Sequence, residues 1–290
     1  MKGIHTVAVL GAGTMGHGIA QVAAQAGRDV RLADAQPGAA EQGLERIRQN
    51  LDGAVLRGKT TAEARDLALG RIRTFADAQH ATRGCDLVIE AVPEQLALKQ
   101  DLLRSVEPGL GDHAILATNT SSLSVAAIAA PLARPGRVIG MHFFNPVHIM
   151  RLLEVVVHER TEPAVRDAAV AFAAELGKDA IVVKDSPGFA SSRLGVALGL
   201  EAMRMLEDGV ASAEDIDKAM VLGYNHPMGP LRLTDLVGLD VRLAIAHYLH
   251  GALDSAVFRP PALLERLVAE GKLGKKSGQG FYSWASGEPT

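Results

Sequence analysis

A glycine-rich loop directly after a short apolar run constrains this chain more than any other feature. The stretch "HTVAVL" (residues 5–10) is expected to be a buried strand, and "GAGTMG" (residues 11–16) follows at the opening of a helix. Glycines here allow a tight turn, close approach to a pyrophosphate and close helix–strand packing. The helix N-terminus adds free N–H groups and the positive end of the helix dipole. The residues predicted to bind a dinucleotide are Gly11, Gly13, Thr14, Met15 and Gly16.

An acidic residue ends the second predicted strand, residues 29–33. This residue is Asp34. A carboxylate at this position can bind the hydroxyl groups of a ribose, and it would repel a 2′-phosphate. The pair of features therefore predicts NAD rather than NADP as the cofactor. The alternative reading is an ordinary tight turn between a strand and a helix.

Short apolar runs recur through the first 185 residues, with helical segments between most of them. Residues 38–74 have helical periodicity instead and predict a helical hairpin inserted between strands, with Thr61 as a helix cap. This alternation predicts an α/β domain of the Rossmann type, with a doubly wound, mostly parallel sheet. The further runs expected to be strands are 86–92, 114–118, 137–144, 152–157 and 180–184.

The pattern changes near residue 185. Residues 186–290 read as an all-α domain, without a convincing strand before the extreme C-terminus. We expect this domain to serve substrate binding and homodimerisation, because it has many apolar faces for its length. The glycine-rich segment "GKKSGQGFY" is interpreted as a solvated turn before a closing strand rather than as a binding element.

The overall charge and the cysteine content exclude several classes of partner. The 290 residues carry a formal net charge of −3, so no strong field favours nucleic acid or an acidic membrane. We find no apolar run long enough for a membrane span and no signal peptide pattern. Cys85 is the single cysteine, which excludes an intrachain disulfide. These features predict a cytoplasmic protein. No spacing of histidine, cysteine and carboxylate residues suggests a metal site.

An ionisable pair interrupts the almost wholly apolar stretch "GMHFFNPVHIMRLLEVV" (residues 140–156). If "FNPVHIM" reverses the chain, His142 and Glu154 come side by side on neighbouring strands. A buried histidine beside a carboxylate is held in one tautomer, as a general base requires. A hydroxyl such as that of Ser121 could bind the same substrate oxygen. With NAD, this predicts oxidation of an alcohol; the alternative is a purely structural histidine.

Seven segments spread over nearly the whole chain carry a family resemblance. They are "VLGAGTMGHGIA", "VIEAVPEQLALK", "NTSSLSV", "GMHFFNPVHIMRLLEVV", "KDSPGF", "NHPMGPLRLTDLVGLDV" and "GKLGKKSGQGFYSW". In these segments and in their order, the chain resembles the short, single-function members of the 3-hydroxyacyl-CoA dehydrogenase family. The resemblance implies a helical domain that dimerises and NAD-dependent interconversion of a (3S)-hydroxyacyl-CoA, such as 3-hydroxybutyryl-CoA, and a 3-oxoacyl-CoA. Fatty acid metabolism, including β-oxidation, would be its setting.

The resemblance also implies roles for single residues. His142 would be the base, Glu154 its partner, and Ser121 would contact the substrate oxygen. Asp34 would bind the adenosine ribose. The other residues implied at the cofactor are Glu94, Lys99, Asn119, Ser121 and Asn145, and those at the substrate are Ser121, His142, Asn145 and Ser192.

The sequence departs from the family pattern at two places. Ser192 in "SPGFASSR" stands where the family usually has an asparagine, and a serine hydroxyl has a shorter reach than an amide. The family's serine and lysine for the CoA phosphates are also missing from "AQPGAAEQG". The basic residues that could replace them are Arg46, Arg48, Arg57 and Lys59. Two alternatives follow: a dehydrogenase of a free sugar acid or hydroxy acid, and a non-catalytic NAD-binding protein.

Overall fold

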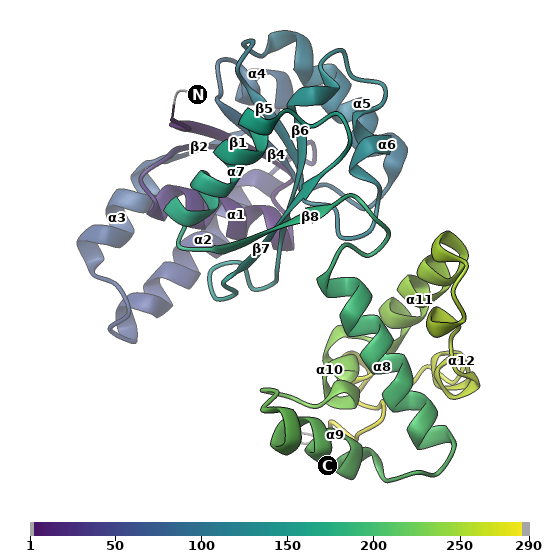
Figure 1. The fold of residues 1–290 in the computed structure, drawn as a ribbon. Helices are drawn as coiled ribbons and strands as arrows, with labels where there is room; N and C mark the ends of the chain where they lie inside the picture. The colour runs from purple at the N-terminus through teal and green to yellow at the C-terminus, as the bar shows by residue number, and fades with distance from the viewer. Residues whose placement is uncertain (1–2, 286–290) are drawn as a thin grey trace. The chain divides into compact units, whose positions relative to one another are not determined.

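The chain forms two compact units, with the division between Ser186 and Pro187 (Figure 1). The structure is a computed structural model, and it describes residues 3–285. The first unit is a sheet covered by helices, and the second is built from helices. The predicted fold class, a Rossmann-type domain followed by a helical domain, is therefore confirmed.

One eight-stranded sheet organises the first unit, in the order β3-β2-β1-β4-β5-β6-β7-β8. All neighbouring strands run parallel except β6 and β7, which are antiparallel. The parallel strands β1, β4, β5 and β6 therefore end at one edge of the sheet. The strands are β1 (Thr6–Leu10), β2 (Asp29–Ala33), β3 (Ile72–Phe75), β4 (Leu87–Glu90), β5 (Ile115–Thr118), β6 (Val138–Phe143), β7 (Leu152–Val157) and β8 (Asp179–Lys184).

Helices cover both faces of this sheet. Residues of α1, α2 and α7 share one core cluster with every second residue of the central strands, such as Ile139 and Met141 of β6. The residue between them, Gly140, faces the other way and lies against Val125 of α6. The helices are α1 (Thr14–Gln25), α2 (Ala39–Leu56), α3 (Ala62–Gly70), α4 (Ala78–Thr82), α5 (Leu96–Val106), α6 (Val125–Ala129) and α7 (Pro163–Glu175).

The predicted hairpin insertion is present as α2 and α3, which project from one side of the sheet (Figure 1). Thr61 caps α3, because its hydroxyl oxygen accepts a hydrogen bond from the backbone N–H of Ala64. The hairpin was expected to continue to residue 74, and that boundary is wrong. Residues 72–75 form β3, an edge strand paired with β2, and only Ile72 of its four residues is buried.

Over its described residues, 187–285, the second unit contains five α-helices around its own core. Its helices are α8 (Ser191–Glu207), α9 (Ala213–Tyr224), α10 (Pro230–Val237), α11 (Leu239–Leu253) and α12 (Ala262–Ala269). Between Pro187 and Ala285, β-structure is limited to the isolated bridges Gly274–Gln279 and Gln279–Ser283. Residues 3–285 contain no helix with the length and apolar character needed to cross a bilayer.

The glycine-rich segment at 274–282 turns at the surface over the exposed residues 275–277, as predicted, but Gly274 and Gly280 on either side of the turn are buried against α10. The carboxylate of Asp235 in α10 accepts hydrogen bonds from the backbone N–H groups of Phe281 and Tyr282. It also accepts one from the indole Nε1–H of Trp284 at 2.8 Å. A Cβ at Gly280 would lie 2.1 Å from Asp235 Oδ1, so only glycine fits against this carboxylate.

Candidate active site

The predicted ionisable pair is formed at the end of β6. His142 lies directly opposite Glu154 in the antiparallel register of β6 and β7. The Nδ1 atom of His142 is 2.7 Å from Oε2 of Glu154. A carboxylate can only accept here, so Nδ1 carries the hydrogen and the basic lone pair lies on Nε2. The chain reversal that brings them together occurs in residues 144–151, as the sequence suggested.

Both side chains of this pair are buried, and a neighbouring ring further restrains the histidine. His142 is 7 % exposed and Glu154 is fully buried. Solvent screens a polar contact weakly in such surroundings, so the hydrogen bond holds the imidazole ring firmly in place. The ring of Phe144 lies 4.4 Å from the His142 ring, centroid to centroid, and restricts its orientation.

Both members of the pair face the α6 side of the sheet. Their neighbours Met141 and Leu153 belong to the core cluster on the opposite side. Gly140 lies two residues before His142 and packs closely against its neighbours. A Cβ added to Gly140 would lie 2.7 Å from the Val156 side chain and 3.0 Å from that of Val125. This close packing fixes β6 against β7 and α6.

Two of the predicted asparagines lie beyond the strand ends. Asn119 follows β5, and its side-chain oxygen accepts a hydrogen bond of 2.9 Å from the backbone N–H of Phe143. That contact anchors the residue next to His142. Asn145 is exposed and precedes a cis peptide bond to Pro146. Contact of either asparagine with the cofactor stays a prediction.

Glu94 organises the loop that carries Ser121. Its Oε1 accepts hydrogen bonds from the backbone N–H groups of Ser121 and Ser122, at 2.9 and 3.1 Å, and from the Thr120 hydroxyl at 2.5 Å. Burial alone raises the pKa of Glu94, but the Thr120 hydrogen bond, the Lys99 charge and the Ser121 N–H together hold this pKa below its ordinary value. Glu94 is thus anionic at neutral pH and fixes Ser121 at the end of β5.

Lys99 lies inside the sheet edge rather than on its surface. It is 1 % exposed, and its ammonium group is 2.7 Å from Glu90 Oε1 and 3.3 Å from Glu94 Oε2. Glu90 also accepts a hydrogen bond from the Thr118 hydroxyl. Desolvation raises the pKa of Glu90, although Lys99 and Thr118 act in the opposite direction. These contacts, together with a hydrogen bond to the Val92 carbonyl, orient Lys99 towards the protein interior, so its contact with the cofactor stays a prediction.

Sequence reasoning did not assign Thr118 to this cluster. Thr118 is the last residue of β5 and lies in register with Glu90, the last residue of β4. The signal was available, because parallel neighbouring strands that end together place their final side chains side by side. It required knowledge of the register, which periodicity alone does not provide.

The glycine loop fits a bound dinucleotide. A Cβ at Gly16 would lie 1.7 Å from the carbonyl oxygen of Gly11, and one at Gly11 would lie 2.6 Å from that of Ala91. Close packing therefore requires both glycines. Around Gly13, by contrast, the space for a Cβ is open, which leaves room for a phosphate against the backbone. The residues present fit the cofactor that the sequence predicts.

Asp34 connects the loop to the ribose position. Its Oδ2 accepts a hydrogen bond from the backbone N–H of Ala12, and its Oδ1 accepts one from Gln36, at 2.8 and 2.9 Å. Each carboxylate oxygen can accept a second hydrogen bond, so Asp34 keeps acceptor capacity for a ribose hydroxyl. Its position beside the glycine loop agrees with the predicted role in NAD binding.

Ser192 lies in the other compact unit, near the start of α8. It is partly exposed. The structure therefore groups His142, Glu154, Asn119 and the Ser121 loop in the first unit and leaves Ser192 as a separate expectation.

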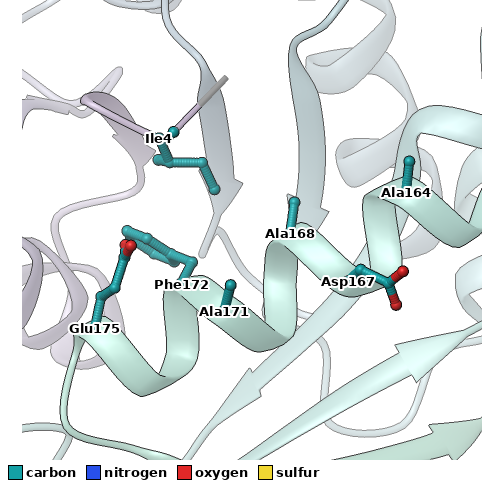
Figure 2. A pocket seen from close by; sticks show the side chains of 8 residues that line it. Ile4, Ala164, Asp167, Ala168, Ala171, Phe172 and Glu175 are labelled. Atoms are coloured by element: carbon teal, nitrogen blue, oxygen red, sulfur yellow. The ribbon is translucent and has the colours of Figure 1, made fainter. Parts of the chain in front are cut away.

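A cavity of about 360 Å³ beneath α7 belongs to a different part of the first unit (Figure 2). It is lined by Gly3 and Ile4, which precede β1, and by residues of α7 such as Phe172. Its lining is mostly apolar, and Glu175 at its rim pairs with Arg28. The cavity lies at the amino end of β1, away from the carboxyl ends where ligands bind in such sheets. Within residues 3–285, no cluster of three or more potential ligands is placed to hold a metal ion.

Comparison with known proteins gives consistent matches over nearly the whole chain. The model of the 3-hydroxyacyl-CoA dehydrogenase NAD-binding domain matches residues 6–186, and that of the family's C-terminal domain matches residues 188–284. The chain is 45 % identical to a probable 3-hydroxybutyryl-CoA dehydrogenase of Bacillus subtilis, over 97 % of this chain and 98 % of that protein.

Solved structures agree with these matches. The crystal structure of FadB2 from M. tuberculosis has a TM-score of 0.93 and 43 % identity, and covers 98 % of this chain and 100 % of that one. A (S)-3-hydroxybutyryl-CoA dehydrogenase from Ralstonia eutropha also has a TM-score of 0.93, with 40 % identity, covering 97 % and 99 % of the two chains. The chain therefore belongs to the 3-hydroxyacyl-CoA dehydrogenase family and is an NAD-dependent oxidoreductase of that family.

Proposed function

We propose that the chain interconverts a (3S)-3-hydroxyacyl-CoA and a 3-oxoacyl-CoA, with His142 as the general base in oxidation and the general acid in reduction. The observation that supports this most is the 2.7 Å contact between His142 Nδ1 and the buried carboxylate of Glu154. The similarity to 3-hydroxybutyryl-CoA dehydrogenases supports a short acyl chain as the first substrate to try. NAD, when bound, supplies the acceptor for the hydride that leaves the alcohol carbon.

The pair gives His142 two properties that the reaction needs. Glu154 holds the ring with its hydrogen on Nδ1, so that Nε2 takes the proton of the substrate hydroxyl. When Nε2 is protonated, the carboxylate stabilises the positive charge on the ring. In the reverse direction, the same Nε2–H donates its proton to the oxygen of the 3-oxo group.

Ser121 is proposed to bind the reacting oxygen. Its backbone is held by Glu94, so its hydroxyl extends from a fixed loop at the end of β5. Asn145 and Ser192 are proposed as further contacts of the substrate, and Lys99 as the residue that keeps Glu94 anionic at the cofactor side. Lys99 supports this role through its 3.3 Å contact with Glu94.

The hairpin of α2 and α3 is proposed to hold the CoA phosphates. Arg46, Arg57 and Lys59 are exposed there, and no acidic side chain between residues 3 and 285 forms an ion pair with any of these three. Arg48 is less suited, because it pairs with Glu45 at 3.6 Å. Exposed cations of this kind bind phosphate as point charges, with an affinity that falls as salt is added.

A homodimer formed through the helical unit and a cytosolic location complete the proposal. Leu222 and Tyr224 at the end of α9 are 80 % and 75 % exposed, and Leu194 of α8 is 71 % exposed. Such apolar exposure favours association with a second copy. Sedimentation equilibrium should give twice the mass of the chain, and a monomer would contradict this part of the proposal.

The deciding experiment is the loss of NADH absorbance on mixing the protein with acetoacetyl-CoA. NADPH and free acetoacetate serve as controls for the cofactor and the CoA group. Turnover with the CoA ester and NADH alone supports the proposal. Turnover with free acetoacetate but with no CoA ester would contradict it and favour a dehydrogenase of free hydroxy acids.

A further inference from the structure

The last residues of β4 and β5 form a buried hydrogen-bond network at the end of the sheet. Glu90 and Thr118 lie in register there, and both are fully buried. The Thr118 hydroxyl donates a hydrogen bond of 2.7 Å to Oε2 of Glu90. The other oxygen, Oε1, accepts hydrogen bonds from Lys99 Nζ and from the Val92 N–H, each at 2.7 Å. A buried carboxylate is costly without such partners, and because both of its oxygens are engaged, the Glu90 side chain is held in one place.

Glu90 in turn determines where the ammonium group of Lys99 lies. An ammonium group has three N–H donors, and three oxygen atoms surround this one. They are Oε1 of Glu90 at 2.7 Å, the carbonyl oxygen of Val92 at 3.2 Å and Oε2 of Glu94 at 3.3 Å. The shortest of the three contacts is the one with Glu90. Loss of that contact would therefore leave Lys99 to move towards Glu94.

Glu94 connects Lys99 with the loop after β5. Its Oε2 faces Lys99, while its Oε1 accepts hydrogen bonds from the backbone N–H groups of Ser121 and Ser122 and from the Thr120 hydroxyl. The two oxygens of one rigid carboxylate thus contact the ammonium group on one side and the loop on the other. A shift of Lys99 would turn this carboxylate and displace the backbone of Ser121.

The two ends of the same loop are fixed by other groups. At its start, the side-chain oxygen of Asn119 accepts a hydrogen bond from the backbone N–H of Phe143. At its end, Oδ2 of Asp185 accepts hydrogen bonds of 2.8 Å from the Ser124 hydroxyl and from the Ala126 N–H. Glu94 binds the middle of the loop, residues 120–122. A change at Glu90 is therefore expected to move this middle part and to leave both ends in place.

We propose that Glu90 and Thr118 are positioning residues for the Ser121 hydroxyl. They act through Lys99 and Glu94, and neither of them touches the substrate. The inference rests on the proposed contact between Ser121 and the reacting oxygen. A displacement of about 1 Å at a reacting centre can lower the rate about 10²-fold, so a buried network far from the chemistry can control kcat.

The test is a double-mutant cycle between positions 90 and 121, with kcat for the reduction of acetoacetyl-CoA by NADH as the readout. Glu90→Ala should lower kcat at least tenfold when Ser121 is present. In a Ser121→Ala background the same change should lower kcat less than twofold, because a hydroxyl that is absent cannot be misplaced. Equal losses in the two backgrounds would show that Glu90 only stabilises the fold, and would overturn the inference. Glu90→Gln keeps one acceptor oxygen for Lys99 and should recover part of the loss.

A milder variant guards against a Glu90→Ala protein that fails to fold. Thr118→Val keeps the shape of the side chain and removes only the hydroxyl that binds Glu90. We expect it to lower kcat at least threefold with Ser121 present and to have no effect in Ser121→Ala. Thr82→Val is the matched control, because Thr82 is also fully buried in the first unit and its hydroxyl binds carbonyl groups of its own helix, α4. A kcat of Thr118→Val equal to that of Thr82→Val would overturn the inference.

NADH binding separates this role from a role at the cofactor. We expect the Kd for NADH, measured by nucleotide fluorescence, to stay within twofold of wild type in Thr118→Val. A Kd that rises as much as kcat falls would overturn the inference and place the effect at the cofactor. Wild-type kcat in Ser121→Ala would remove the proposed role of Ser121, and this inference with it, while turnover by the wild-type protein leaves the proposed reaction standing.

Discussion

The ammonium group of Lys99 lies 2.7 Å from the carboxylate of Glu90, and both side chains are buried at the end of β4. Lys99 also reaches Glu94, whose other oxygen holds the backbone of Ser121. A chain of charge-assisted hydrogen bonds thus runs from the sheet interior to the loop that is proposed to meet the substrate.

Replacement of the base should affect turnover far more than folding. His142→Gln is expected to lower kcat for acetoacetyl-CoA reduction by about 10²–10⁴-fold, the usual contribution of general acid–base catalysis. Glu154→Gln should cause a smaller loss, because the ring remains but its protonated form is less stabilised. His148→Gln, in the exposed loop nearby, is the control. Near wild-type turnover in a folded His142→Gln protein would refute the proposed role.

Two glycines of the same loop should respond differently to alanine. Gly16→Ala places a Cβ 1.7 Å from the Gly11 carbonyl oxygen, so we expect it to distort the loop and lower the melting temperature. In Gly13→Ala the added Cβ meets no atom within 4 Å. The free energy of unfolding should therefore stay within about 0.5 kcal/mol of the wild-type value, as is usual where no contact is lost. The substitution should nevertheless weaken NADH binding, measured by nucleotide fluorescence. Unweakened NADH binding would argue against a phosphate at Gly13.

Acid should remove a stabilising contribution from Glu94. The pKa of Glu94 in the folded chain lies below its ordinary value of 4.5, since the Thr120 hydrogen bond, Lys99 and the Ser121 N–H outweigh desolvation. Its contribution to stability is therefore complete above pH 4.5 and is lost as the pH falls through the folded-state pKa. In urea melts between pH 6 and pH 3, Glu94→Gln should be less stable than wild type at pH 6, and the difference should shrink below pH 4.5. Glu159→Gln, an exposed control, should show no such trend, and a constant difference for Glu94→Gln would contradict the assignment.

The C-terminal segment should depend on Asp235. Asp235→Asn replaces one acceptor oxygen by a donor, so it leaves at least one buried N–H of residues 281, 282 or 284 without a partner. The expected loss is about 1–3 kcal/mol in the free energy of unfolding. Trp284 is the only tryptophan, so its fluorescence reports on this same segment. The exposed Asp208→Asn is the control, and equal stability of both variants would show that the contacts contribute little.

Most of the fold follows from local patterns, because each buried strand of the parallel sheet is a short apolar run. β3 was not predicted because it is an edge strand with one buried residue, so its sequence contains no apolar run. The turn at residues 275–277 was predicted, but the burial of Gly280 was not, because such glycines resemble those of a flexible turn. Its real constraint is a carboxylate from α10, some 45 residues earlier, that only a tertiary structure reveals.

The site was predictable to the extent that its residues follow strand ends. His142 and Glu154 could be paired because a single reversal separates their strands. The burial of Lys99 could not be foreseen, since a lysine after a strand usually reaches solvent, and its place depends on Glu90 and Thr118 ending adjacent strands together.

The antiparallel pairing of β6 with β7 has a consequence for changes in chain length. His142 and Glu154 meet because the two strands are paired in one register, and a shift by a single residue would turn one of them to the opposite face. The connection at residues 144–151 can therefore gain or lose residues without separating the pair, provided that the strands keep their alignment. A one-residue deletion inside either strand would instead separate the base from its partner, although both residues would still be present in the chain.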